Sequence, residues 1–253
     1  MPRFKLTIEY AGTRYSGWQI QTNAKTVQGE IDRAVRTVTR RKDFELYGAG
    51  RTDAGVHAAA QVAHLDVVTT LPGEALRRRL NEELPADINI LAADPVPHRF
   101  HARHDAVARR YVYQLSRRRT AFAKPFVWWV KEPLDLARMR DAAGTLVGMH
   151  DFARFAERDA NDDEVTDRST MVLVERFEIV EEGSLVLVVV EGSHFLWKMV
   201  RRLVGVLVET GHGRPMPRDA ARFTAPPSGL FLERVFYADD TRDQTIRALI
   251  PCR

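Results

Sequence analysis

The chain of 253 residues contains a single cysteine, Cys252. With no second thiol, it forms no internal disulfide and offers no cysteine cluster for a metal ion. Long apolar runs are also missing, since the most apolar stretch, residues 185–190, is far shorter than the roughly 20 residues that span a bilayer. Residues 1–7 show no apolar signal region. We therefore expect a cytoplasmic protein with no membrane partner.

The common phosphate-binding loops are absent as well. Gly48-Ala49-Gly50 begins like the dinucleotide motif G-x-G-x-x-G, but Asp53 stands where the third glycine is required. No G-x-x-x-x-G-K-[ST] string occurs anywhere in the chain. The sequence therefore gives no support to a nucleotide-binding loop of either kind.

Positive charge is present in clusters rather than in large excess. The formal net charge is only +4, although the isoelectric point is near 9.4. Clustered arginines and lysines are typical of a surface that binds a polyanion, but solvated arginines scattered over an ordinary surface would give the same composition. The clusters lie at residues 36–42, 77–79, 99–110, 117–119 and 198–202.

The length allows one large domain or two of ordinary size. We divide the chain into an N-terminal half, residues 1–105, and a C-terminal half, residues 106–253. Each half mixes antiparallel-looking strands with helices, so the fold class is α+β and a duplicated plan is consistent with the pattern. Period-two and helical patterns predict strands at residues 4–10, 44–47, 61–67, 88–96, 110–115, 170–180, 184–191 and 230–238, and helices at 27–39, 73–84, 134–146, 195–210 and 217–223.

Three local features accompany these elements. Thr26 is expected to cap the helix at 27–39. Tyr15 and Trp18 stand in a polar stretch and are expected to be exposed. Residues 157–167 are mostly acidic without apolar periodicity, which is typical of a mobile loop.

Residues 50–58, with the sequence Gly-Arg-Thr-Asp-Ala-Gly-Val-His-Ala, are the most informative stretch. They join two predicted strands, and their glycines permit a tight turn. A short Gly-Arg-Thr-Asp-Ala-Gly string taken alone is more often a hairpin whose aspartate caps its own turn. A loop held between two strands is, however, a common place for a catalytic side chain.

Other strings stand out by composition. They are Arg109-Arg110-Tyr111-Val112-Tyr113, residues 194–202, and residues 225–232, which include Leu230. In the second of these strings, we expect Lys198, Arg201 and Arg202 to lie away from the apolar side of the helix. Tyr111 and Tyr113 alone would be ordinary strand aromatics. His150-Asp151-Phe152 and Phe155 form a further string.

Taken together, these strings resemble the TruA-type family of tRNA pseudouridine synthases. The resemblance extends from Tyr10-Ala11-Gly12-Thr13 and Gly17-Trp18-Gln19 to Leu230, and the string at residues 50–58 is unbroken. It implies a pseudouridine synthase fold, in which two RRM- or ferredoxin-like halves form one extended, mainly antiparallel sheet with a central cleft. It also implies an isomerase that acts on flipped uridines at positions 38, 39 and 40 of the tRNA anticodon stem-loop, as a homodimer and without a cofactor.

The resemblance assigns roles to five residues. Asp53 is the catalytic carboxylate, and Arg51 helps to hold the flipped nucleotide open. Tyr111 and Leu230 contact the target base, while Tyr113 is left to packing. Arg201 pairs with the catalytic aspartate or with a phosphate, a role that Arg202 would also fit.

Other functions fit parts of the sequence. A non-catalytic RNA-binding module would keep the basic clusters but has no need of Asp53. A pseudouridine synthase acting on another RNA remains an alternative. His98, His101 and His104 with Asp105 match a zinc ligand set by type, although residues three apart point to opposite faces of a strand. His57 lacks a nearby serine or cysteine for a hydrolase, so we expect it to make buried structural hydrogen bonds.

Overall fold

The computed structural model describes residues 1–157, 169–217, 219–242 and 245–252. By its internal contacts the chain forms two compact units. The first is Met1–Val107 with Phe231–Thr241, and the second is Ala108–Leu230 with Arg242–Arg253. The last strand therefore begins at the end of the second unit and continues in the first. The division into domains at residues 105 and 106 stays a prediction.

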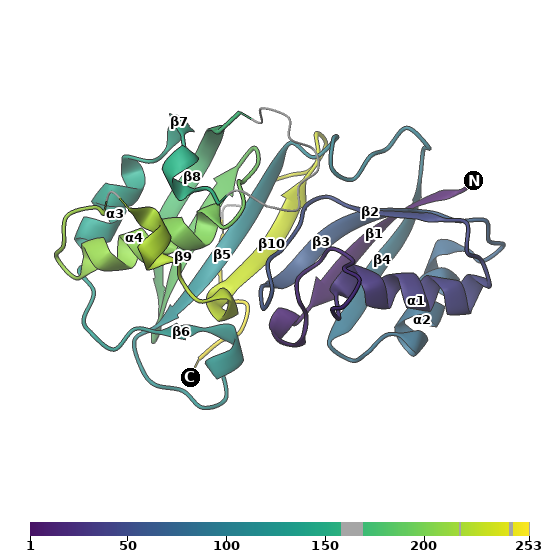
Figure 1. Cartoon of the computed structure of the whole chain (residues 1–253), viewed down its shortest axis with the longest axis horizontal. Helices are drawn as coiled ribbons and strands as arrows, with labels where there is room; N and C mark the ends of the chain where they lie inside the picture. The colour runs from purple at the N-terminus through teal and green to yellow at the C-terminus, as the bar shows by residue number, and fades with distance from the viewer. Residues whose placement is uncertain (158–168, 218, 243–244, 253) are drawn as a thin grey trace. The chain divides into compact units, whose positions relative to one another are not determined.

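The first unit is a sheet with two helices (Figure 1), antiparallel except for the parallel pairing of its last strand. β1 (Arg3–Tyr10) pairs with β4 (Ile88–Val96) on one side and with β3 (His57–Asp66) on the other. The free side of β3 pairs at one end with β2 (Glu45–Gly48) and at the other, through residues 57 and 58, with β10 (Leu230–Phe236). With α1 (Val27–Thr39) and α2 (Gly73–Glu83), the chain order is β-α-β-β-α-β, the ferredoxin-like pattern.

Local sequence explains the helices of this unit. Thr26 caps α1 by accepting a hydrogen bond from the Gly29 amide, as predicted. The apolar stripe of α1, with Ile31 and Val35, is fully buried, as are Leu76 and Leu80 of α2. α2 packs on β4, and α1 packs on α2. The core therefore lies between the sheet and the helix pair.

The second unit repeats the α+β plan (Figure 1). Its antiparallel strands follow the order β5 (Ala108–Ser116), β9 (Leu185–Gly192), β8 (Met171–Glu182) and β7 (Gly148–Asp151), with β6 (Trp128–Trp129) parallel to the end of β5. The helices α3 (Leu136–Gly144) and α4 (Met199–Gly211) pack on each other. All residues of β9 are buried, which explains its continuous apolar run. The α+β class is thus confirmed.

Short 3-10 helices connect several of these elements. They are Gly12–Arg14, Lys124–Phe126, Ala153–Phe155, Ala220–Phe223 and Pro227–Gly229. The helix predicted at 217–223 is therefore one 3-10 turn at its C-terminal end. None of the described helices is long and apolar enough to cross a bilayer.

Three expectations about the chain were wrong. The helix predicted from residue 195 begins at Met199, because Lys198 adopts a left-handed conformation (φ 59°) just before it. Arg202 is buried rather than solvated, and Tyr15 and Trp18 are buried as well. Of the acidic segment predicted to be a loop, only Glu157 lies within the described residues.

Candidate active site

The loop at residues 49–56 leaves β2 and enters β3 in the first unit. The Ala49 amide donates to the Val62 carbonyl over 2.7 Å, and the Gln61 side chain donates to the Gly50 carbonyl over 3.0 Å. Both bonds tie the start of the loop to β3. From there the chain passes through exposed Arg51, buried Thr52 and half-buried Asp53.

A tight turn fixes the loop beyond Asp53. The Val56 amide donates to the Asp53 carbonyl over 3.1 Å, and the Gly55 amide donates to the Tyr15 carbonyl over 3.2 Å. Gly55 has φ 79°, a conformation that residues with a Cβ rarely adopt. The backbone on the C-terminal side of the Asp53 carboxylate is therefore held in one conformation.

Thr52 is held by the segment that follows β1. Its hydroxyl shares a 2.8 Å hydrogen bond with the Tyr10 hydroxyl, and its carbonyl accepts from the Trp18 amide over 3.1 Å. Since Thr52 is buried, both polar groups need these partners. The residue directly before Asp53 is thus anchored through its side chain and its backbone.

Gly12 brings the same segment into close contact with the loop. A Cβ on this residue would lie only 1.8 Å from the Val56 carbonyl oxygen. The Gly12 amide also donates to Nδ1 of His57 over 3.1 Å. The segment at residues 10–18 and the loop therefore pack backbone against backbone, and only glycine fits at position 12.

His57 has the structural role expected of it. Its ring is 1% exposed and stacks on Phe231 of β10 at 4.7 Å with an interplanar angle of 25°. Because Nδ1 accepts from the Gly12 amide, a neutral His57 carries its proton on Nε2. The ring thus joins three segments of the first unit, those at Gly12, the loop and β10.

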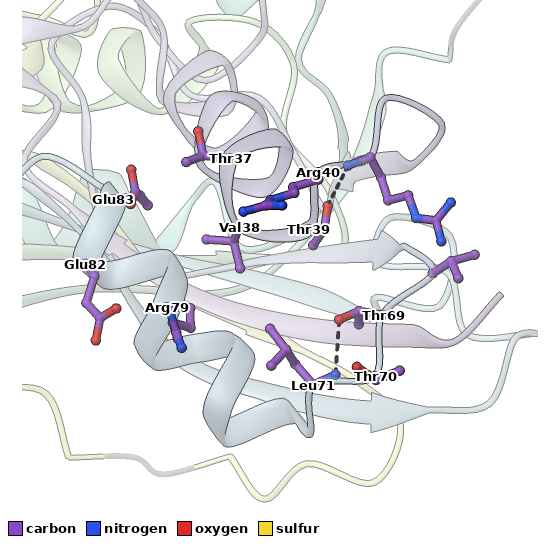
Figure 2. A pocket seen from close by; sticks show the side chains of 12 residues that line it. Thr37, Val38, Thr39, Arg40, Thr69, Thr70, Leu71, Arg79, Glu82 and Glu83 are labelled. Carbon is purple, nitrogen blue, oxygen red and sulfur yellow. Dashed lines mark hydrogen bonds between the residues drawn. The ribbon is translucent and has the colours of Figure 1, made fainter.

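Of two hollows on the first unit, one adjoins this loop. The smaller hollow, about 80 Å³, is lined by Arg51, Trp18, Tyr47 and Arg103 among others. The larger one, about 530 Å³, lies between the end of α1, the loop at residues 68–71 and one side of α2 (Figure 2). Its wall combines arginines with glutamates and includes no residue of the 49–56 loop. The larger hollow is therefore not the one beside the loop that contains Asp53.

The other predicted site residues belong to the second unit. Tyr111 lies on β5 with its ring half-buried, edge-on to Phe195 at 5.3 Å and 90°. Tyr113 is fully buried, and its hydroxyl donates to the Pro226 carbonyl over 2.7 Å. Burial raises the pKa of Tyr113 well above its ordinary value. Tyr113 therefore packs, as expected, whereas Tyr111 keeps part of its ring accessible.

Arg201 and Leu230 belong to two sequence strings that the structure connects. Nε of Arg201 donates to the Ala225 carbonyl over 2.8 Å, and the Ala225 amide donates to the Arg201 carbonyl over 3.0 Å. Leu230, five residues further, is 5% exposed at the start of β10. The first turn of α4 thus holds the stretch that leads to Leu230.

Arg202 is used differently from Arg201. Its guanidinium donates to the Ala156 carbonyl and pairs with the Glu157 carboxylate. The side chain is buried, so these partners compensate its charge. Arg202 therefore has a structural role in the second unit.

The histidines at 98, 101 and 104 do not gather around a common point. His98 is exposed and lies 3.5 Å from Asp66, while the rings of His101 and His104 pack on each other at 4.2 Å. Among the described residues no three histidine, cysteine, aspartate or glutamate side chains are grouped to hold a metal ion. The zinc hypothesis therefore finds no support in this part of the chain.

The residues that brace the loop were not identified from the sequence. Tyr10 and Gly12 had been noted only as part of strings, Trp18 had been expected to be exposed, and Thr52 and Phe231 had been given no role. Tyr10 and Thr52 are 42 residues apart, and Gly12 and His57 are 45 apart. No local period indicates such pairs.

Comparison with known proteins adds to this geometry. The family described as "tRNA pseudouridine synthase" matches residues 6–105 and 142–238, more than half of the chain. A protein of Nitrobacter hamburgensis named tRNA pseudouridine synthase A is 41% identical over 251 residues, which cover 94% of this chain and all of that protein. A Myxococcus xanthus protein of the same name is 40% identical, over 94% of this chain and 93% of its own. In Clostridium tetani, a protein named tRNA pseudouridine synthase A 2 is 37% identical, over 92% and 98%.

Proposed function

Because this chain belongs to the tRNA pseudouridine synthase family, we propose that it converts uridine to pseudouridine in the anticodon stem-loop of tRNA, at positions 38, 39 and 40. The relatives match over nearly their full length, and their name supplies the reaction and the substrate. The choice of the anticodon stem-loop rests on the resemblance of the motifs. The alternative within the family is an enzyme acting on another RNA.

The rearrangement requires a carboxylate rather than a redox partner. The N1–C1′ bond of uridine breaks, the uracil turns, and a C5–C1′ bond forms, with the C5 proton finally moved to solvent and N1 protonated. Electrons balance without an oxidant or reductant. A carboxylate that acts as nucleophile or base at the sugar or the uracil serves this chemistry. The target base is stacked in the stem-loop, so it must first be flipped out.

Asp53 supplies that carboxylate. Its backbone is fixed on one side by buried Thr52 and on the other by the turn to Val56. The side chain is half-buried, so a substrate can reach it. Catalytic groups held in place before the substrate arrives avoid the cost of ordering them in the transition state. The braced loop with Asp53 is the observation that carries this proposal.

The other four residues handle the flipped nucleotide. Tyr111 stacks on or hydrogen-bonds to the base, and Leu230 packs against the uracil. Phe195 supports the Tyr111 ring, and the bond to Ala225 orients the Arg201 guanidinium. Arg201 neutralises negative charge, either of the Asp53 carboxylate or of a phosphate. Exposed Arg51 holds open the position that the base has left.

The test is a modification assay on an unmodified tRNA transcript with U at positions 38, 39 and 40. Pseudouridine is mapped by carbodiimide adducts and primer extension, for the wild type, Asp53→Asn and the exposed control Asp43→Asn. We expect stops in the anticodon arm with the wild type and with Asp43→Asn, and none with Asp53→Asn, while all three proteins bind the transcript. Equal stops from all three would remove Asp53 from the mechanism.

Two further outcomes separate the alternatives. Stops elsewhere in the transcript, or only in another RNA, would indicate a different target for the same chemistry. Binding without any modification would indicate an RNA-binding module. We also propose that the protein works as a homodimer, which light scattering of the purified protein checks independently of activity.

A further inference from the structure

An aromatic side chain stands almost fully in water on the second unit. Phe122 is 97% exposed, far more than any other large apolar side chain described. It lies in the connection between β5 and β6, visible as a long loop in Figure 1. We call residues 117–131 the basic loop. Solvating a whole phenyl ring is unfavourable, so contact with a flat apolar surface would stabilise it.

The exposure of Phe122 does not come from a loosely held backbone. The next residue, Ala123, is buried together with Val127 in a cluster with Val112 and Leu187. The Ala123 carbonyl accepts from the Phe126 amide over 2.8 Å. Beyond this turn, Leu115 and Ser116 pair with both residues of β6. The loop is therefore anchored directly beside Phe122, and it presents the ring outward.

The same loop concentrates positive charge. Residues 117–131 contain three arginines and two lysines and neither aspartate nor glutamate. Arg117 pairs with Glu181 at 3.1 Å. Within the described residues no ion pair involves Arg118, Arg119 or Lys124, all of which are exposed. In the part of the chain that the structure describes, no carboxylate therefore neutralises these three cations.

A second aromatic ring belongs to this surface. Trp129 is 40% exposed, and the guanidinium of Arg119 lies over its ring at 5.9 Å. An arginine over an aromatic face is attracted by the ring quadrupole, which orients its planar group at the surface. Exposed aromatic rings interleaved with cations match the chemistry of an RNA strand, with bases that stack and phosphates that bind arginine.

We propose that the basic loop is an RNA-binding surface, separate from the five site residues, in which Phe122 stacks on an unpaired base and Arg118, Arg119 and Lys124 bind the adjacent phosphates. The proposal rests on RNA being the substrate, as proposed above. Charge favours RNA over a protein partner here, because three cations without carboxylate partners would be costly to bury in a protein interface, whereas the phosphates of RNA neutralise them.

Binding of an unmodified tRNA transcript tests the stacking part. Its dissociation constant is measured by fluorescence anisotropy for the wild type, Phe122→Ala and Phe122→Trp. Phe122→Ala leaves the core intact because the ring has no packing to lose. We expect Phe122→Ala to weaken binding by about 5- to 150-fold, the range for loss of one stacked base, and Phe122→Trp to bind like the wild type.

The salt dependence of binding tests the phosphate contacts. The double variant Arg118→Gln/Arg119→Gln should lower the slope of log Kd against log salt by roughly 1.4 to 1.8, the value for two phosphates. The matched control is Arg138→Gln/Arg222→Gln, which removes two exposed arginines of the same unit that pair with Asp135 and Asp219. The control should leave the slope unchanged.

The outcomes keep this proposal apart from the proposed function. Wild-type binding by Phe122→Ala and by the double variant, with pseudouridine still formed, would refute the RNA contact and leave the activity standing. Weakened binding by the variants, with no pseudouridine formed by the wild type or by any variant, would support the contact and contradict the activity. If Phe122→Ala instead halved the mass found by light scattering while the monomer bound RNA normally, the ring would be a contact between copies of this chain, and the RNA contact would be refuted.

Discussion

Replacing Gly12 by alanine gives a direct test of how the loop at residues 49–56 is positioned. The added Cβ would lie 1.8 Å from the Val56 carbonyl oxygen, whereas real Cβ atoms essentially never come within 3.0 Å of another atom. The two backbones must therefore separate by about 1.2 Å, the difference between these distances. Moving either backbone costs stability, because the clash is with the main chain and not with the end of a flexible side chain.

The displacement should reach Asp53. Val56 and Asp53 are joined by the hydrogen bond of the turn, so the loop moves as a unit. A misplacement of about 1 Å costs on the order of a hundredfold in rate. Crowding of a well-packed interior lowers the free energy of unfolding by about 1–3 kcal/mol. We therefore expect Gly12→Ala to stay folded and to react roughly a hundredfold more slowly.

The assay is a single-turnover measurement of pseudouridine formation, with enzyme in excess over tRNA and circular dichroism to confirm the folded state. Gly144→Ala is the matched control, because a Cβ at Gly144 at the end of α3 meets no atom within 4 Å. The control should react within about twofold of the wild type. A folded Gly12→Ala protein with a wild-type rate would refute the idea that this contact positions the loop.

Three further predictions concern stability. Glu191 pairs with Arg110 at 2.7 Å, and both side chains are buried. Glu191→Gln should therefore lower the free energy of unfolding, measured by urea titration, by about 3–5 kcal/mol. A loss below about 1 kcal/mol would contradict this. Tyr113→Phe leaves the Pro226 carbonyl without its buried donor and should cost about 1–3 kcal/mol in the same assay. Burial lowers the pKa of His64 to about 4, below its ordinary value of 6.5, so between these pH values only the unfolded chain binds this proton. The free energy of unfolding should therefore fall as the pH is lowered from about 6.5 to about 4. His64→Gln should flatten this part of the plot of urea midpoint against pH.

The regular elements were largely predictable because each follows from a local pattern. The bounds of α1 and its Thr26 cap agree with the prediction, as do the bounds of β4. The start of α4 was wrong by four residues, since the apolar period continues through Phe195 although Lys198 interrupts the helix. Phe195 packs on Tyr111 instead, a contact between residues 84 positions apart. Periodicity records which side chains are apolar and not which partner they meet.

Burial around the site was harder to predict than secondary structure. Tyr15 and Trp18 stand among polar residues, which favours exposure, yet both are buried: the Tyr15 hydroxyl donates to Asp87, and the Trp18 ring lies against Gly48. The helical pattern predicts that Arg202 is solvated, but its guanidinium donates to the Ala156 carbonyl and pairs with Glu157 inside the second unit. In each case a distant segment supplies the cover or the hydrogen-bond partner. Local composition contains no information on that segment.

The sequence by itself determined the α+β class, most strands and helices, and, through the unbroken string at residues 50–58, the family and the carboxylate proposed as catalyst. Only the tertiary structure decided how that loop is held: Tyr10 against Thr52, Gly12 against Val56, and His57 between Gly12 and Phe231. The physical reason is that secondary structure follows from side chains a few positions apart, whereas the loop is fixed by side-chain and backbone contacts between segments about 40 residues or more apart. Those contacts exist only once the sheet has brought β1, β3 and β10 together.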